Sequence, residues 1–277
     1  MIVAAVAGWQ LARTKLATLT AALLCLSLVG GAYVSHHPAA VPEFAISALA
    51  CYLQTSWYAP LATALFYLAA CQSYLRSLDP KRKLAQWTRM QVMLGLLATA
   101  LLYAAAAPTL FSPEEIRAEL RDVHAINGPA QVNGVLVRQS LNYTCGPSAC
   151  ATLLRAAGID SNASEDEMAV LCMTRPHAGS SVLGMAAGLK AKTAAQGWRV
   201  KIVAPEWPEF MTLHKPAVCA MTFNGSPHVV VALEVDPEKG IHVADPVGVN
   251  SWVPFNEFKS EFNGDVVVVF RNDPLEP

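Results

Sequence analysis

The stretch QSLNYTCGPSACATLLRAAGI, residues 139–159, places a cysteine next to a helix-forming run, six residues after Gln139. The residues from Pro147 onward predict a helix that ends at Gly158, with Cys145 at its N-terminus. The partial positive charge and unpaired N–H groups of a helix N-terminus favour the thiolate form of such a cysteine. A lone cysteine in a helix is more often an inert core residue, so a nucleophilic thiol is indicated only if partners exist elsewhere in the chain.

A thiol nucleophile requires a base, a group that orients the base, and a donor for the developing oxyanion. The segment HVVVALEVDPEKGIHVADPVG, residues 228–248, supplies the first two. Its Pro-Glu-Lys-Gly turn predicts a hairpin in which His228 opens one strand and Asp245 closes the next, which brings the two side chains together. Gln139 supplies an amide N–H from the loop before the helix. These four residue types at these spacings favour a catalytic site around Cys145.

The second half of the chain predicts helices first and strands later. Helical patterns cover 145–158, 164–172 and 180–197, and Ser112 is the expected N-cap of a further helix over 112–123. After a short strand within GVLVRQ, β-branched runs predict the main strands, namely WRVKIVA, PAVCAMTF, HVVVALEV, GIHVADPV and DVVVVFR. N-terminal helices packed on an antiparallel sheet make an α+β fold.

The segments QSLNYTCGPSACATLL and HVVVALEVDPEKGIHVADPVG together resemble the papain-like, bacteriocin-processing double-glycine cysteine peptidase family. That family has a glutamine six residues before a Cys-Gly, a histidine that starts a strand, and an Asp-Pro at the end of the following strand. The resemblance covers residues 130–271 and implies a papain-like cysteine peptidase domain. It also implies Cys145 as nucleophile, His228 as base, Asp245 as the group that orients the base, and Gln139 as oxyanion donor.

The resemblance implies a cysteine-type peptidase that cuts peptide or protein substrates after small residues, most of all glycine. It concerns the peptidase domain only, without an ATP-driven exporter part. The sequence has no GxxxxGK[ST] phosphate loop, so no ATP site is expected in this chain. The alternative is a papain-like domain that binds peptides or transfers acyl groups without peptidase activity. The four site residues favour the peptidase.

The first part of the chain, residues 1–112, predicts an all-α membrane region. Only 15% of all residues are charged, and most of these lie after Ser112. A bilayer core of ~30 Å takes about 20 apolar residues, and three apolar runs long enough to cross it predict transmembrane helices at 16–34, 44–75 and 91–112. Residues 113–130 are the expected linker helix and turn, and 131–277 the expected peptidase domain.

The loop RSLDPKRKLAQWTR, residues 76–89, carries five Lys and Arg residues against one Asp. Basic loops stay in the cytoplasm, so three spans would leave the peptidase domain on the other side. The sequence therefore predicts an integral protein of the cytoplasmic membrane with an extracytoplasmic peptidase domain, and membrane lipid as a partner.

Other classes of protein are disfavoured by composition. A net charge of −1 gives no sign of a nucleic-acid partner. The seven cysteines form no CxxC pair and no Cys/His spacing typical of zinc, so neither a metal site nor a cofactor is expected. Cys150 and Cys172 are either two buried thiols or a disulfide. Cys219 is expected in the core of a strand, and His124 has no identifiable partner.

Overall fold

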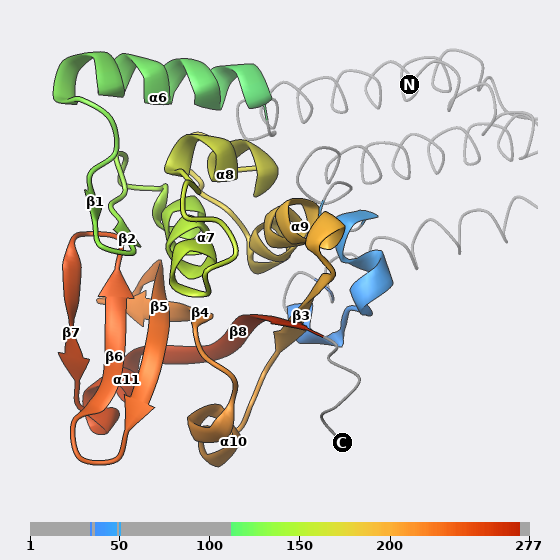
Figure 1. Ribbon diagram of the computed structural model, residues 1–277, viewed down its shortest axis with the longest axis vertical. Helices are drawn as coiled ribbons and strands as arrows, with labels where there is room; N and C mark the ends of the chain where they lie inside the picture. The colour runs from blue at the N-terminus through green and yellow to red at the C-terminus, as the bar shows by residue number, and fades with distance from the viewer. Residues whose placement is uncertain (1–33, 35–36, 49, 51–111, 272–277) are drawn as a thin grey trace, which may run out of the picture. The chain divides into compact units, whose positions relative to one another are not determined.

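The computed structural model describes residues 34, 37–48, 50 and 112–271 (Figure 1). The unit that contains nearly all of them combines His37–Gln54 with Phe111–Pro277. It is an α+β domain in which helices precede and cover an antiparallel sheet. The α+β prediction is confirmed, while the division of the chain at residues 112 and 130 stays a prediction.

Helix α6 (Pro113–Asn127) begins as its sequence predicts. The Ser112 hydroxyl accepts the Glu115 N–H at 3.3 Å, and proline fills the first helical position, where a missing N–H costs nothing. Its buried residues, Ile116 and Leu120, join a small apolar cluster with residues of the following loop and of α8. In Figure 1, α6 lies across helix α8 at one end of the domain.

Helices α7 (Cys145–Ala156) and α9 (Val182–Thr193) pack on the sheet, and α8 (Glu165–Leu171) packs on these two helices. Serine caps start the last two, because Ser164 accepts from the Glu167 N–H and Ser181 from the Gly184 N–H. Helices α8 and α9 approach closely at Gly188, where an added Cβ would lie 2.6 Å from the Cys172 sulfur.

All pairings in the main sheet of the described residues are antiparallel. The strand order is β3-β8-β4-β5-β6-β7, with β3 (Trp198–Val203), β8 (Phe262–Arg271), β4 (Ala217–Phe223), β5 (Ser226–Asp236), β6 (Gly240–Asp245) and β7 (Val249–Val253). A separate short hairpin joins β1 (Val132–Asn133) to β2 (Leu136–Val137). The predicted β5–β6 hairpin is confirmed, since Asp236 pairs with Gly240 at its turn.

Side-chain alternation gives the sheet two buried faces. On one face, Val230 of β5 belongs to an aromatic-rich cluster with residues from two short helices, α10 (Trp207–Thr212) and α11 (Phe255–Glu261). On the other face, where α7 packs, Val229 and Val231 are buried. The sequence did not predict α10, α11 or β7. Strand β7 is an exposed edge strand without the apolar alternation by which the other strands were recognised.

The predicted all-α transmembrane region is corrected by the structure. In the described ranges, 34, 37–48, 50 and 112–271, no helix is long and apolar enough to cross a membrane. The predicted spans 16–34, 44–75 and 91–112 lie almost wholly outside these ranges. The prediction of an integral protein of the cytoplasmic membrane, with an extracytoplasmic domain, depended on those spans and is corrected by the same finding.

The start of the second predicted span shows why hydropathy misled. Residues 43–45 form a short 3₁₀ turn whose Glu43 pairs with Arg199 of β3. Ile46, three residues further, is fully buried. Ile46 therefore packs within the α+β unit, whereas Phe44 in the same stretch is 84% exposed.

Candidate active site

Cys145 is the first residue of α7 and is partly exposed. The residue before it, Thr144, does not cap the helix with its side chain. Its hydroxyl instead donates to the Leu141 carbonyl at 2.9 Å and accepts the Leu141 N–H at 3.1 Å. The N–H groups of the first turn therefore remain unpaired by a cap, so their partial positive charge lies beside the Cys145 sulfur.

The glycine after the cysteine lies at a tightly packed position. A Cβ on Gly146 would lie 3.1 Å from both the Met185 sulfur and the Ser180 Cβ. This contact brings the start of α9 against the first turn of α7. Gly146 thus permits close approach of the two helices at the position of Cys145.

His228 and Asp245 meet at the open end of the β5–β6 hairpin. The ring nitrogen Nε2 of His228 donates to Oδ1 of Asp245 at 2.8 Å, and the Val247 N–H donates to the same oxygen at 3.0 Å. The two side chains are only 14% and 13% exposed. Phe223 lies beside the imidazole, with 5.1 Å between ring centroids. The pair is therefore held in a fixed orientation and largely shielded from water.

The Cys145 side chain also lies close enough to the His228 imidazole to raise its pKa. Burial disfavours a charged ring, but hydrogen bonds to Asp245 and Cys145 and the charge of the Asp245 carboxylate outweigh it, raising the pKa of His228 to about 9. At neutral pH the arrangement therefore holds an imidazolium beside the thiol, which is the charge state that stabilises a thiolate.

This raised pKa predicts the alkaline limit of activity. The imidazolium form predominates at neutral pH and is lost as pH rises through about 9. We expect kcat/KM to fall above this pH, because no proton then remains on His228 for the leaving amine. Asp245→Asn removes the carboxylate charge that raises the pKa of His228, so the fall in kcat/KM should shift to lower pH. A pH–rate profile of both proteins checks the shift, and identical alkaline limbs would contradict it.

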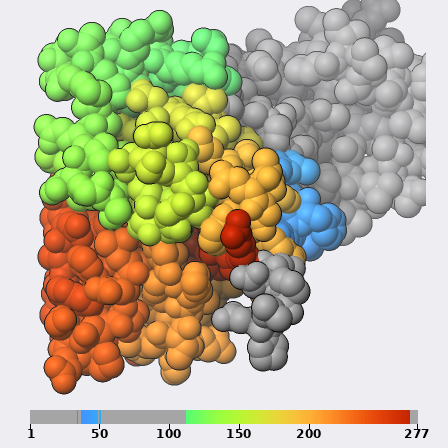
Figure 2. Space-filling view, in the orientation of Figure 1, coloured from blue at the N-terminus to red at the C-terminus, as the bar shows by residue number. Residues whose placement is uncertain are grey.

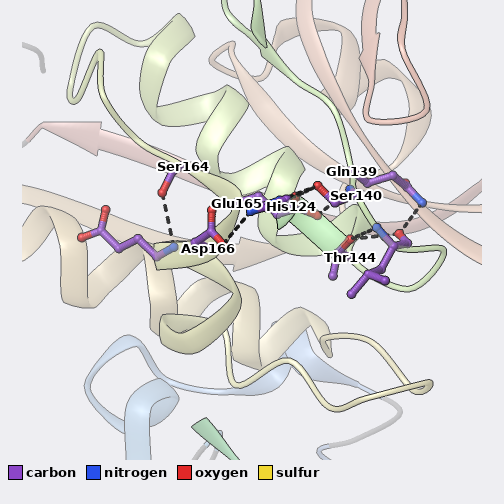
Figure 3. A network of polar contacts seen from close by, with 9 residues as sticks. His124, Gln139, Ser140, Thr144, Ser164, Glu165 and Asp166 are labelled. Carbon is purple, nitrogen blue, oxygen red and sulfur yellow. Dashed lines mark hydrogen bonds and ion pairs between the residues drawn. The ribbon is translucent and has the colours of Figure 1, made fainter. Parts of the chain in front are cut away.

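Gln139 lies close to the group but is held by its own loop. Its backbone N–H donates to the carbonyl of Pro246, the residue after Asp245, at 2.9 Å. Its side-chain Nε2 donates to the Leu141 carbonyl at 2.9 Å, and its Oε1 is buried without a hydrogen-bond partner in the structure (Figure 3). One of the two N–H bonds of Nε2 is thereby used, which leaves the second for a ligand.

A buried polar network next to Gln139 was not predicted from the sequence. Glu165 accepts hydrogen bonds from Ser140, and the Ser140 hydroxyl contacts His124 of α6 (Figure 3). Burial raises the pKa of the Glu165 carboxyl despite these bonds. The expectation that His124 has no partner is therefore wrong. In the sequence, Glu165 is visible only as part of the helical pattern over 164–172.

The other cysteines of the domain are enclosed. Cys150 and Cys172 are buried free thiols, and the pKa of Cys150 is raised well above its ordinary value by burial and by the neighbouring Cys172. Cys219 is fully buried in β4, as predicted, and burial raises its pKa to about 12. Within residues 34, 37–48, 50 and 112–271, no group of three or more His, Cys, Asp or Glu side chains is placed to hold a metal ion.

A family and several similar proteins match this chain. The Peptidase C39 family matches residues 133–274. An uncharacterised protein of Methanothermobacter marburgensis is 32% identical over 140 residues, which cover 50% of this chain and 90% of that protein. The probable functional amyloid protease FapD of Pseudomonas aeruginosa is 30% identical over 153 residues, covering 50% of this chain and 64% of FapD.

A similar solved structure is that of a double glycine motif protease from an AMS/PCAT transporter in complex with the leader peptide. It has a TM-score of 0.42 and 21% identity, and the likeness covers 52% of this chain and 94% of that chain. The resemblance that was inferred from two segments of sequence is confirmed by the family match, which extends over slightly more than half of the chain. On this ground, the chain belongs to the Peptidase C39 family and is a cysteine-type peptidase.

Proposed function

We propose that this protein hydrolyses peptide bonds with Cys145 as nucleophile, His228 as acid and base, Asp245 as the group that orients His228, and Gln139 as oxyanion donor. The proposal rests on one observation above all. His228 from β5 is hydrogen bonded to Asp245 from β6 at 2.8 Å and interacts with Cys145 from α7, so three separate elements bring these side chains together. A nucleophile, its base and an orienting carboxylate in this order are the parts that thiol catalysis requires.

The reaction proceeds in two halves. The Cys145 thiolate attacks the substrate carbonyl carbon, and the oxyanion that forms accepts a hydrogen bond from the free N–H of Gln139. The C–N bond then breaks as the His228 imidazolium gives its proton to the leaving amine, which leaves a thioester on Cys145. His228, now neutral, takes a proton from water, and the hydroxide attacks the thioester. The carboxylic acid product leaves, and the thiolate and imidazolium are restored.

Gln139→Ala is expected to lower kcat by about 10²–10³-fold, the usual loss for one oxyanion donor. KM should change little, because the oxyanion exists only after attack. Steady-state kinetics of the two proteins measure this loss. Gln131→Ala is a suitable control, because that glutamine is exposed and bonds only to Arg138 through its side chain. Equal effects of the two substitutions would contradict an oxyanion role.

The substrate that we propose is a peptide or protein cut after a small residue, most of all glycine. This preference rests on the resemblance to double-glycine peptidases. A peptide library incubated with the full-length protein tests it, with mass spectrometry of the products. Cleavage mainly after glycine is the expected result, and cleavage mainly after bulky or basic residues would contradict it. Transfer of the acyl group to an added amine, in place of hydrolysis, would instead favour the acyl-transferring alternative.

A further inference from the structure

Glu165 is a buried carboxylate that belongs neither to the Cys145–His228–Asp245 chain nor to an ion pair with Lys or Arg in the described residues. Its side chain has 0% exposure. Its Oε1 accepts the Ser140 backbone N–H at 2.8 Å, and its Oε2 accepts the Ser140 hydroxyl at 2.5 Å (Figure 3). Both oxygens accept from Ser140, and the Thr144 side chain also interacts with the Glu165 carboxyl. This arrangement fixes the backbone and the side chain of Ser140 together.

Ser140 is placed where such a restraint controls the site. It directly follows Gln139, and the loop from Ser140 to Thr144 leads into α7 at Cys145. On its other side, the Gln139 backbone is held by the carbonyl of Pro246. The loop is thus attached to the Asp245 turn at one point and to Glu165 at the next. Any movement of Ser140 away from Glu165 moves the Cα of Gln139 and hence its side-chain amide.

The third member of the network comes from α6. The Nε2 atom of His124 lies 2.9 Å from the Ser140 hydroxyl and 3.9 Å from the Glu165 carboxylate. Since the Ser140 hydroxyl donates to Glu165, its oxygen is available to accept a hydrogen from Nε2 of His124. The other ring nitrogen lies 3.4 Å from the carboxylate of Asp166. The His124 ring is therefore held between α8 and the Gln139 loop.

Helix α6 lies outside the segment that the family match covers. The match begins at residue 133, whereas α6 ends at Asn127. Figure 2 shows this helix, in green, lying along the yellow residues of α8 at the edge of the domain. Its apolar residues Ile116 and Leu120 anchor it there, which sets the position of the His124 ring. An element before the family's common segment thus reaches the loop of the proposed oxyanion donor.

We propose that Glu165 is a positioning residue for the peptidase reaction. The network of His124, Ser140 and Glu165 holds the loop that carries Gln139, and helix α6 acts on the site through His124. The role assigned to Gln139 rests on the proposed function above. The network touches no reacting atom in this account, so it acts on the geometry of oxyanion stabilisation and leaves the ionisation of Cys145 to His228 and Asp245.

Three variants of the full-length protein test this role. Glu165→Gln keeps the shape but has one acceptor oxygen, so an NH₂ group faces one of the two Ser140 donors. His124→Ala removes the donor from α6, whereas His124→Gln supplies another N–H. A displacement of about 1 Å at a reacting group costs about 10²-fold in rate. We therefore expect kcat to fall about 10–10²-fold in Glu165→Gln and His124→Ala, with KM nearly unchanged. His124→Gln should recover part of this loss. Glu167→Gln is the matched control, because Glu167 lies on the same helix, is 44% exposed, and pairs with Lys192 outside the network.

Two further readouts separate positioning from general damage. The rate at which iodoacetamide alkylates Cys145 requires no oxyanion donor and should stay at the wild-type value in all variants. Hydrogen–deuterium exchange of the peptide that contains Ser140 should accelerate in both Glu165→Gln and His124→Ala. The first substitution weakens the hydrogen bond of the Ser140 N–H, and the second removes the contact of its hydroxyl with His124. Unchanged exchange and kcat in both variants would overturn the proposal. A fall in alkylation and thermal stability in proportion to kcat would also overturn it, since it indicates a structural role.

These readouts also distinguish this proposal from the proposed function. If the Cys145→Ala protein keeps its turnover, the assignment of the nucleophile fails, but the exchange of Ser140 still reports on the network. If Cys145→Ala is inactive while Glu165→Gln and His124→Ala behave as wild type, the thiol mechanism stands and the positioning role is wrong.

Discussion

Replacement of Cys145 by alanine is expected to abolish peptide hydrolysis, with a loss in kcat of about 10⁵–10⁶-fold, because the nucleophile acts as a unit with its base and no other group can form the thioester. The fold should persist, since the change removes one sulfur atom from a partly exposed position at the start of α7. Steady-state hydrolysis of a glycine-containing peptide, together with circular dichroism of the folded protein, measures both effects.

Cys150→Ala is the matched control for this prediction. Cys150 lies in the same helix, is fully buried and contacts Cys172 rather than His228. Its loss should lower stability through a small cavity while turnover continues. Normal turnover in the Cys145 variant, or equal loss of turnover in both variants, would contradict the assignment of Cys145 as nucleophile.

His228→Ala is expected to be nearly as severe as loss of the nucleophile. Without the imidazole, the thiol loses its positively charged neighbour, and the leaving amine loses its proton donor. The matched control is His242→Ala on strand β6, because His242 stacks on Trp252 with 5.0 Å between ring centroids and lies near Glu234. Single-turnover kinetics of both variants make the comparison. A His228 variant that acylates at the wild-type rate would exclude the role of base.

The central part of the site could be predicted because its residues lie in local patterns. The cysteine precedes a helix within one continuous stretch, and the Asp236–Gly240 turn fixes which strand ends meet. His228 and Asp245 are separated by a single hairpin, so local turn chemistry was sufficient to bring them together. The exact register at the site could not be predicted, because a β-bulge between Ala232 and Glu234 shifts the pairing between the turn and the site.

The network around Glu165 could not be predicted in the same way. Ser140 lies 25 residues from Glu165 and 16 from His124, and the three residues come from a loop and two helices whose packing no local pattern specifies. The membrane prediction failed for a related reason. Hydropathy shows that a residue avoids water, but it does not show whether protein or lipid surrounds it. Ile46 is buried within the α+β unit.

The most direct test of the account is the reaction of the full-length protein with iodoacetamide at pH 7, followed by peptide mapping and by assay of the remaining activity. The mapping distinguishes Cys145 from the other cysteines of the chain. The account predicts that Cys145 is alkylated first, that activity is lost in proportion to its alkylation, and that His228→Ala slows the reaction. Full alkylation of Cys145 with activity retained, or inactivation while Cys145 remains unmodified, would contradict it.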